Sequence, residues 1–529
     1  MSNLFLAEKV LRECYAAGVR DFCICAGARN SPFVFLLDKA KSGGLIYVHS
    51  FFEERSAAFF ALGRAERDSR PVAVITTSGT AVAELLPAVI EAHYTGKPLM
   101  LITADRPREY RGTGAPQSIE QVGIFSNYVE KTLDIAVEEE LRGLSEWSMT
   151  SPIQLNICFD EPLIDGEVET LDFSTIEPIM PHSSLYSKKD KDLCLDIELD
   201  SPLVILGSIP DISRNLVFEF LVSTALPIYV ESISGLRGLL AGDARTAGRL
   251  INGGNKSITA AATRGNFKSV IRIGGVPTLR FWRDLESKHV NMSVVSISST
   301  KYTGLARKSF HFGGFENLNK LKKQIHPSEY PGFYAVDKQY EKQIFSALEP
   351  GPFSEPNLVR KISKLLDGKS VYLGNSLPIR EWDLVSDVSI SLKRIFANRG
   401  ANGIDGQIST FMGWAETGSE NWAIVGDLTA LYDLTSLWAT EFLSDSKCRI
   451  LVINNGGGHI FKNMFKHEAF LNRHQIQFRN WAEMWGWEYV RWIDIPSKKE
   501  ISSLHEKIII ELFPNEAQTE KFWQEFDIK

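Results

Sequence analysis

Two consecutive strand ends carry side chains whose types and spacing could bind a metal. In AIVGDLTALYDL, residues 423–434, an apolar run leads into Gly426 and Asp427, and an apolar, helix-like stretch follows. The next apolar run, ILVINNGGGHIF at 450–461, ends in two asparagines and three glycines. Asn455 follows Asp427 at about the length of one strand–helix–strand unit. We therefore expect the two strand ends to be neighbours.

These two strand ends would bring together a carboxylate, an amide oxygen and an exposed glycine carbonyl, which we assign to Asp427, Asn455 and Gly457. Hard oxygen ligands of this kind suit Mg²⁺, which usually shares its coordination shell with phosphate oxygens. The glycines let the backbone approach a diphosphate, and the turn at Gly426 opens onto a helix N-terminus, which favours anions. Taken alone, Asp427 would be better explained as a helix N-cap. The neighbouring strand end is what favours a metal site.

Length and charge indicate a large protein that acts on small molecules. The chain has 529 residues, of which 44% are hydrophobic, so we expect two to four domains with their own cores. The formal net charge is −7, from 58 basic and 65 acidic residues. Affinity for nucleic acid or an anionic membrane would need a basic face, so we expect neither kind of partner.

Cysteine usage and hydropathy favour a cytoplasmic protein. The six cysteines show neither a disulfide framework nor paired metal-ligand spacing, which suits a reducing compartment. The start of the chain, MSNLFLAEKVLREC, mixes charges into an amphipathic helical pattern. No apolar run approaches the roughly 18 residues that span a bilayer, so we expect no membrane insertion.

Short apolar strands alternate with longer amphipathic helices in three blocks, which predicts an α/β fold with parallel-sheet cores flanked by helices. Pro-containing polar segments separate the blocks. The domains predicted from these breaks are residues 1–184, 185–350 and 351–529. Ligands of such sheets bind beyond the carboxyl ends of the strands, where Asp427 and Asn455 fall.

The Gly-Asp and Asn-Asn pair resembles the diphosphate motif of thiamine diphosphate enzymes, with Leu428 in place of the glycine that usually follows the aspartate. Longer stretches are similar to the 2-succinyl-5-enolpyruvyl-6-hydroxy-3-cyclohexene-1-carboxylate synthase family of menaquinone and phylloquinone synthesis. They are TSGTAVAELLPAVIEAHYTGKPLMLITADRP, GAPQSIEQVGIFSNYV, NRGANGIDGQIST and GDLTALYDL. The similarity covers most of the first and third predicted domains, and the middle domain matches by pattern.

This resemblance implies a thiamine diphosphate-binding fold and an enzyme that needs thiamine diphosphate and Mg²⁺, or Mn²⁺ in its place. The implied reaction decarboxylates 2-oxoglutarate and adds the four-carbon unit to isochorismate by conjugate addition. The resemblance further implies a homodimer or homotetramer. Each active site would lie between the pyrimidine-binding domain, residues 1–184, of one subunit and the diphosphate-binding domain, residues 351–529, of another.

The resemblance also assigns residues around the cofactor. Glu54 matches the glutamate that exchanges a proton with the cofactor's pyrimidine ring, although the adjacent Glu53 fits an acidic first helical turn equally well. Ile404 matches the bulky residue on which the cofactor folds, and Ile460 and Phe461 match an apolar pair beside the thiazolium, although core packing would also explain all three. The implied cofactor-binding set is Glu54, Ile404, Gly426, Asp427, Leu428, Asn455, Ile460 and Phe461.

Two dicarboxylate substrates call for arginines, whose planar fork pairs with a carboxylate in bidentate fashion. Five arginines and two polar residues match substrate-binding positions of the family: Arg29, Arg106, Arg280, Arg380, Arg399, Gln117 and Ser376. Of these, Arg380 and Arg399 are assigned to catalysis together with Glu54. Ala28 departs from the family, which usually has serine before the first arginine.

Two alternatives stay open at this level. An acetohydroxyacid synthase or another 2-oxoacid decarboxylase would share Glu54, Asp427 and Asn455, but it would have little use for several carboxylate-binding arginines. A catalytically inactive paralogue that acts as a binding protein would keep the fold without the activity. The intact Glu54, Asp427 and Asn455 argue against it, and Ala28 is the one feature in its favour.

Overall fold

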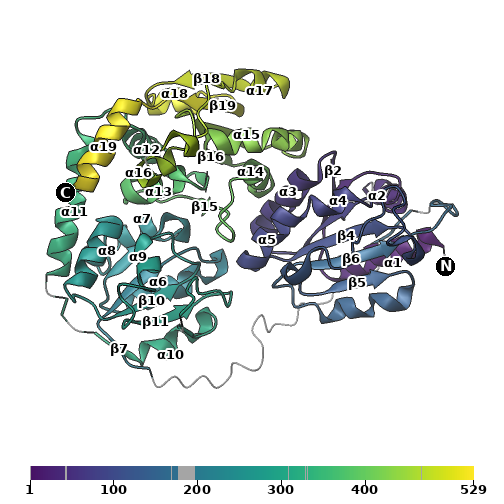
Figure 1. Ribbon diagram of the computed structural model, residues 1–529, viewed down its shortest axis with the longest axis horizontal. Helices are drawn as coiled ribbons and strands as arrows, with labels where there is room; N and C mark the ends of the chain where they lie inside the picture. The colour runs from purple at the N-terminus through teal and green to yellow at the C-terminus, as the bar shows by residue number, and fades with distance from the viewer. Residues whose placement is uncertain are drawn as a thin grey trace. The chain divides into compact units, whose positions relative to one another are not determined.

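The computed structural model describes residues 2–41, 45–167, 170–174, 176, 197–307, 309–327, 329–330, 332–465 and 467–528. The chain divides into two compact units (Figure 1). The first unit comprises Met1–Leu185, Gly400–Thr417 and Tyr432–Ser446, and the second comprises Tyr186–Arg399, Gly418–Leu431 and Lys447–Lys529. The boundary predicted between residues 184 and 185 lies outside the described residues.

The first unit is built on a six-stranded parallel sheet with strand order β2-β1-β3-β4-β6-β5. Its central strands are buried along their whole length, as expected for a sheet that is covered on both faces. The strands are β1 (Asp21–Cys25), β2 (Tyr47–Phe51), β3 (Val72–Thr76), β4 (Leu99–Asp105), β5 (Thr132–Ile135) and β6 (Ile153–Cys158).

Five helices of the first unit connect or flank these strands: α1 (Asn3–Ala16), α2 (Ser31–Lys41), α3 (Glu54–Asp68), α4 (Thr80–Ala83) and α5 (Leu86–Thr95). The stretch TAVAELLPAVIEAHYT, residues 80–95, forms two helices with a break at residues 84–85. Pro87 falls in the first turn of α5, where its missing N–H and fixed φ favour a new helix start.

Two segments that follow far along the chain complete the first unit. They contain α14 (Gln407–Trp414) and the 3₁₀ helix η9 (Leu434–Phe442). The backbones of α3 and α14 approach closely through glycines: a Cβ on Gly63 would lie 2.1 Å from the Thr410 carbonyl oxygen, and one on Gly413 would lie 2.0 Å from that of Phe60. Glycine is therefore required on both helices for this packing.

Among the residues that the structure describes, the second unit holds three further parallel sheets, one of them with only two strands. The five-stranded sheet has the order β12-β11-β10-β8-β9, with β8 (Pro202–Leu206), β9 (Ile228–Val230), β10 (Ser269–Ile273), β11 (Ser293–Ile297) and β12 (Phe310–His311). A short parallel pair joins β7 (Leu199–Asp200) to β13 (Ile325–His326). Five helices accompany these strands and a sixth follows them: α6 (Arg214–Val222), α7 (Arg237–Gly242), α8 (Gly254–Thr263), α9 (Arg280–Asp284), α10 (Leu318–Lys322) and α11 (Phe333–Leu348).

The other six-stranded sheet has the order β15-β14-β16-β17-β19-β18 and is again fully parallel. Its strands are β14 (Ser370–Leu373), β15 (Arg394–Phe396), β16 (Glu420–Gly426), β17 (Lys447–Ile453), β18 (Glu488–Trp492) and β19 (Lys507–Leu512). Its helices are α12 (Glu355–Leu365), α13 (Leu377–Val385), α15 (Asp427–Tyr432), α16 (Lys462–Phe465), α17 (Arg479–Met484), α18 (Lys498–Ser502) and α19 (Glu516–Ile528). Counted along the chain, its strand order is the same as that of the first sheet. The predicted α/β fold with parallel sheets flanked by helices is confirmed.

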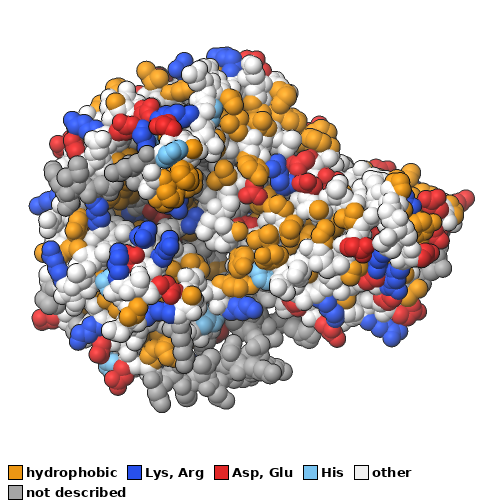
Figure 2. Space-filling model, viewed as in Figure 1, with side chains coloured by type: hydrophobic (Ala, Val, Ile, Leu, Met, Phe, Trp, Pro, Cys, Tyr) orange, Lys and Arg blue, Asp and Glu red, His pale blue; other side chains and the backbone are white. Residues whose placement is uncertain are grey.

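Charged side chains of both signs lie at the surface of the molecule (Figure 2). On the face shown in Figure 2, acidic and basic side chains are interspersed over the surface. Among the described residues, no helix combines the length and the apolar character that crossing a membrane requires.

Candidate active site

The ends of β16 and β17 bring Asp427 and Asn455 together. The two strands pair in parallel, with Gly426 opposite Ile453. The buried Asp427 carboxylate accepts hydrogen bonds at Oδ2 from the backbone N–H groups of Gly456, at 2.8 Å, and Gly457, at 3.0 Å. The same Gly457 N–H lies 3.3 Å from Oδ1 of Asn455. Both side-chain oxygens therefore lie beside a single backbone amide.

Glycine is needed in the loop that follows β17. Gly457 has φ +144°, and a Cβ there would lie 2.3 Å from the carbonyl oxygen of Leu471. In contrast, a Cβ on Gly426 would meet no heavy atom within 4 Å, so there is open space beside this strand end. The following helix α15 is short, and its half-buried Leu428 donates its backbone N–H to Asp427 Oδ1 at 2.7 Å. The loop geometry leaves room for a group in front of Gly426.

The donor set at this site fits a divalent cation. Among the described residues, no group of three or more His, Cys, Asp or Glu side chains could hold a metal. A cation bound here would thus rely on Asp427, the amide oxygen of Asn455, the Gly457 carbonyl and oxygens of a ligand, which is the coordination that Mg²⁺ prefers. Burial raises the pKa of Asp427, and His474, with Nε2 at 3.3 Å from Oδ2, counteracts this.

Arg380 and Arg399 lie near the ends of β14 and β15, at the same edge of the sheet. Arg380 donates to the Ser376 carbonyl at 2.6 Å, and Arg399 donates to Asn375 Oδ1 at 2.6 Å. Partial desolvation, and then the positive charge of Arg399, lower the pKa of Arg380. Ser376 has φ +74°, a strained conformation for a residue with a side chain. Two cations held close together in this way are suited to bind anions.

The remaining predicted residues of the second unit lie on α9 and in the segment that follows the glycine loop. Arg280 is the first residue of α9, which follows β10 of the five-stranded sheet. The residue is exposed, and its Nε lies 3.3 Å from Asp284 of the same helix. Ile460 and Phe461 belong to the 3₁₀ helix η10 (His459–Phe461), which directly follows the glycine loop. The Phe461 ring is 37% exposed, so core packing does not account for it.

In the first unit, Glu54 and Glu53 have different environments. Glu53 is the N-cap of α3: its carboxylate accepts from the backbone N–H groups of Arg55, at 3.1 Å, and Ser56, at 3.0 Å. Glu54, the first residue of α3 after β2, is half-buried, and burial raises its pKa. A carboxyl group of this kind keeps a proton closer to neutral pH, as proton exchange with a ligand requires. Glu53 therefore has the capping role, which sequence alone could not assign to either glutamate.

The loop that carries Ile404 belongs to the same unit as Glu54. Glu91 of α5 accepts hydrogen bonds from the backbone N–H groups of Gly400 and Ala401, both at 2.7 Å. Gly406 has φ +61°, and a Cβ there would collide with the Phe59 ring of α3. These contacts anchor both ends of the loop around the half-buried Ile404.

Arg29, Arg106 and Gln117 follow strands of the first sheet. Arg29, after β1, is 6% exposed and donates to the Phe159 carbonyl at 3.0 Å. Burial, and then the charge of Arg106, lower its pKa. Arg106, after β4, donates to the Pro116 carbonyl at 3.2 Å. The exposed Gln117 follows that proline directly, and Ala28 is exposed beside Arg29.

The structure also shows polar residues that sequence reasoning missed. Glu355, the first residue of α12, accepts a hydrogen bond from Asn455 Nδ2 at 2.9 Å, and its carboxyl group lies against that of Glu381 from α13. Both are fully buried; burial raises the pKa of Glu355 to about 7 and that of Glu381 well above its usual range. No periodicity or motif marks these residues, because acidic residues in helical first turns and on helix surfaces are common.

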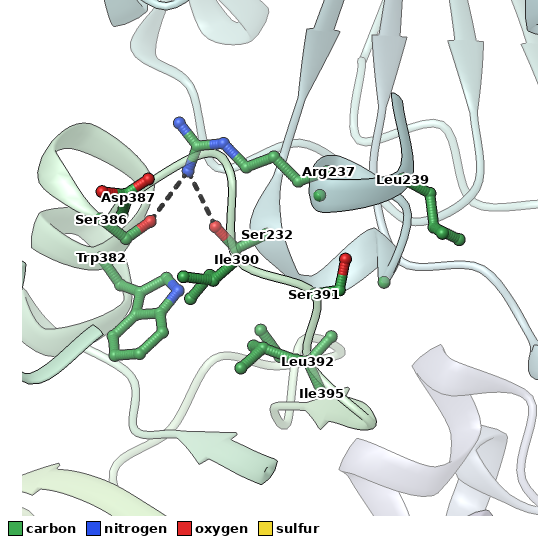
Figure 3. A pocket seen from close by; sticks show the side chains of 12 residues that line it. Ser232, Arg237, Leu239, Trp382, Ser386, Asp387, Ile390, Ser391, Leu392 and Ile395 are labelled. Atoms are coloured by element: carbon green, nitrogen blue, oxygen red, sulfur yellow. Dashed lines mark hydrogen bonds between the residues drawn. The ribbon is translucent and has the colours of Figure 1, made fainter. Parts of the chain in front are cut away.

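A cavity of about 100 Å³ lies elsewhere in the second unit (Figure 3). Arg237 of α7 donates to the hydroxyl groups of Ser232 and Ser386 beside it, and Trp382 and Ile390 supply apolar lining. None of the predicted site residues lines this cavity.

Comparison with known proteins identifies the family. Residues 5–124 match the model of the thiamine pyrophosphate enzyme N-terminal TPP binding domain, a range that includes Arg29, Glu54, Arg106 and Gln117. A 2-succinyl-5-enolpyruvyl-6-hydroxy-3-cyclohexene-1-carboxylate synthase of Bdellovibrio bacteriovorus is 47% identical over 100% of this chain and 99% of its own. The chain belongs to this synthase family.

Further members of the family match nearly as much of the chain. The synthase of Akkermansia muciniphila is 36% identical over 97% of both chains. That of Vibrio vulnificus is 30% identical over 92% of this chain and 90% of its own. Membership of this family makes the chain a thiamine diphosphate-dependent enzyme, as the sequence motifs predict.

Proposed function

We propose that this enzyme decarboxylates 2-oxoglutarate and adds the resulting four-carbon unit to isochorismate, giving 2-succinyl-5-enolpyruvyl-6-hydroxy-3-cyclohexene-1-carboxylate for menaquinone biosynthesis. The family's name states this product. The observation that carries the proposal is the convergence of Asp427, Asn455, Arg380 and Arg399 at one edge of a parallel sheet. This edge combines the oxygen ligands for a metal–diphosphate with cations for dicarboxylates.

Asp427, Asn455 and the Gly457 carbonyl would hold Mg²⁺, or Mn²⁺ as a substitute, and the open space beside Gly426 would take the cofactor's diphosphate. Leu428, Ile460 and Phe461 would contact the cofactor near this site, and Ile404 would be the bulky residue against which it packs. When bound, thiamine diphosphate supplies the electron sink that decarboxylation of a 2-oxoacid needs.

Glu54 serves as the acid–base group, because its partly desolvated carboxyl group can hold a proton for exchange with the pyrimidine ring. Arg380 and Arg399 orient substrate carboxylates during the reaction. Arg29, Arg106, Arg280, Gln117 and Ser376 complete the substrate site. Arginine forks favour dicarboxylates over pyruvate, since pyruvate would leave a guanidinium without a partner.

We further propose a homodimer or homotetramer with active sites at the subunit interface. Mixing Glu54→Gln and Asp427→Ala chains tests this arrangement. If each site combines residues from two subunits, one of the two sites in a mixed dimer carries both substitutions and the other carries neither. Activity therefore returns on mixing. If each chain held its own complete site, every site in the mixture would carry one defect and activity would not return.

We also propose that the enzyme is located in the cytoplasm. The described cysteines, Cys14, Cys23, Cys25, Cys158 and Cys448, are free and buried, in keeping with a reducing compartment.

The reaction itself is tested by supplying 2-oxoglutarate and isochorismate together. We expect CO₂ release to match isochorismate consumption one for one. Turnover of pyruvate at the same rate, without regard to isochorismate, would instead place the enzyme with acetohydroxyacid synthases or simple 2-oxoacid decarboxylases.

A further inference from the structure

Glu355 lies directly behind the proposed metal ligand Asn455. Its Oε2 accepts a hydrogen bond from Asn455 Nδ2 at 2.9 Å, and its own side chain is buried, with 1% of the residue exposed. The residue stands at the start of α12, where its backbone N–H donates to Thr519 Oγ1 at 2.9 Å. Glu355 is therefore fixed both by its helix and by a contact with α19.

The second carboxyl group behind the site belongs to Glu381, which is 0% exposed and lies against Glu355. Glu355 is thus enclosed by the protein on all sides, and its Oε2 is the oxygen that accepts from Asn455.

An asparagine side chain has one end that donates and one that accepts. A neighbour that can only accept leaves a single favourable orientation, with the NH₂ group toward Glu355 and the carbonyl oxygen on the opposite side. On that side Oδ1 of Asn455 lies beside the Gly457 N–H, which Asp427 also contacts. Without Glu355 only the longer contact with the Gly457 N–H, at 3.3 Å, would hold the amide, which could then turn over and present its NH₂ group, and an NH₂ group cannot bind a cation.

We propose that Glu355 is a positioning residue that turns the amide oxygen of Asn455 toward the metal. The inference rests on the proposed function, in which Asn455 is a metal ligand. It assigns to the buried Glu355 a role that neither the sequence motifs nor the family comparison indicates. Outer partners of this kind commonly determine metal affinity.

The test is the affinity of the purified full-length protein for Mn²⁺ in the presence of thiamine diphosphate, measured by electron paramagnetic resonance of free Mn²⁺. In Glu355→Leu, which fills similar space without an acceptor, we expect the affinity to fall about 10- to 100-fold. Glu355→Gln should stay within about threefold of wild type, since its oxygen can accept from Asn455 while its NH₂ group donates to Glu381.

Glu381→Gln is the matched control. It changes the same buried pair but leaves the contact with Asn455, so its Mn²⁺ affinity should stay near that of wild type. A loss in Glu381→Gln equal to that in Glu355→Leu would show that disturbing the pair, not the hydrogen bond, causes the effect, and would overturn the inference.

Activity gives a second readout. In Glu355→Leu the Mg²⁺ concentration for half-maximal rate should rise with the loss of affinity, while kcat at saturating Mg²⁺ should recover to near wild type. A merely structural defect would lower kcat without this shift. If Glu355→Leu does not fold, a crystal structure of the wild-type Mn²⁺–cofactor complex decides. In it, Asn455 must bind the metal through Oδ1 and donate a hydrogen bond from Nδ2 to Glu355.

The outcomes separate this inference from the proposed function. Wild-type protein that fails to bind Mn²⁺ with thiamine diphosphate would overturn both. Wild-type binding together with unchanged affinity in folded Glu355→Leu would overturn the role of Glu355 alone.

Discussion

The two six-stranded sheets have the same strand order but present different chemistry at corresponding strand ends. Arg29 follows β1, and Ser376 follows the corresponding strand β14 of the other sheet. Glu54 follows β2, and Arg399 follows the corresponding strand β15. Ser78 and Gly79 follow β3, whereas the corresponding β16 ends at Gly426 and is followed by Asp427. Arg106 follows β4, and Asn455 follows the corresponding strand β17.

This correspondence teaches that topology determines where a site lies and the loops determine what it does. In both sheets the order reverses between the first and third strands, β1 and β3 in one and β14 and β16 in the other, which is where α/β sheets bind ligands. The buried carboxylate needed for a metal follows only one of these third strands, β16. The half-buried carboxyl group suited to proton exchange, Glu54, follows the second strand of the other sheet. The sheets should therefore respond to mutation in different ways.

The largest effect is expected at Asp427. Asp427→Ala removes the carboxylate at the end of β16, so thiamine diphosphate–Mg²⁺ affinity should fall by at least about 100-fold, beyond what loss of an outer partner costs. The melting temperature without cofactor should stay close to that of wild type. Calorimetric titration with cofactor and Mg²⁺ measures the affinity, and an unchanged value would remove the metal site from this sheet.

In the first sheet, Glu54→Gln should leave cofactor binding near wild type and slow proton exchange instead. The variant keeps the shape of the side chain but lacks the titrating proton. Exchange of the bound cofactor's C2 proton for deuterium should slow by about 100-fold or more, the usual scale of acid–base catalysis. NMR of quenched samples follows the exchange.

Glu53→Gln is the control for this experiment. Its carboxylate caps α3, so the substitution should cost about 1 kcal/mol of stability or less and leave exchange at the wild-type rate. Slower exchange in Glu53→Gln than in Glu54→Gln would reverse the assignment.

The arginines at the ends of β14 and β15 should affect substrate choice. Wild type should prefer 2-oxoglutarate over pyruvate by at least about 100-fold, because pyruvate leaves a guanidinium unpaired. Arg380→Ala and Arg399→Ala should each reduce this preference by about tenfold or more, or uncouple CO₂ release from isochorismate consumption. Cofactor affinity should hardly change in either variant.

Arg245→Ala provides the comparison for these two variants, since Arg245 is exposed and pairs with Asp243 on the surface. The ratio of kcat/KM for the two oxoacids, measured as CO₂ release, should be unchanged in it. An equal ratio in all four proteins would separate these arginines from substrate recognition.

The last prediction concerns stability rather than activity, at Asp433, a buried aspartate of the first unit. Burial raises its pKa from 3.8 to about 6, although Ser409 donates to it from its backbone N–H, at 2.7 Å, and its hydroxyl group, at 2.9 Å. Because the folded state holds this proton more tightly than the unfolded chain, the group's contribution to stability is lost as pH rises from about 4 through 6.

Asp433→Asn removes that dependence. The stability of the variant relative to wild type should increase by at most about 3 kcal/mol between pH 4 and pH 7. Thermal unfolding across this pH range measures the difference. A constant difference would show that Asp433 does not titrate there.

Sequence alone predicts the parallel strands and the pairing of Asp427 with Asn455, because apolar runs mark buried strands and the carboxyl ends of adjacent parallel strands lie together. It does not predict the break between α4 and α5, which depends on Pro87, or the return of the Ile404 loop to the first unit, which depends on Glu91 and on glycine contacts with α3. Sequence does not predict the roles of Glu355, Glu381 and His474, because only tertiary packing brings these residues next to Asn455 and Asp427. Local pattern carries no sign of such contacts.

The most direct test of the account is simultaneous measurement of CO₂ release and isochorismate consumption by the wild-type enzyme with thiamine diphosphate, Mg²⁺ and 2-oxoglutarate. The account predicts one CO₂ for each isochorismate consumed and little consumption of either substrate alone. CO₂ release from 2-oxoglutarate at full rate without isochorismate, or no reaction with both substrates present, would contradict it.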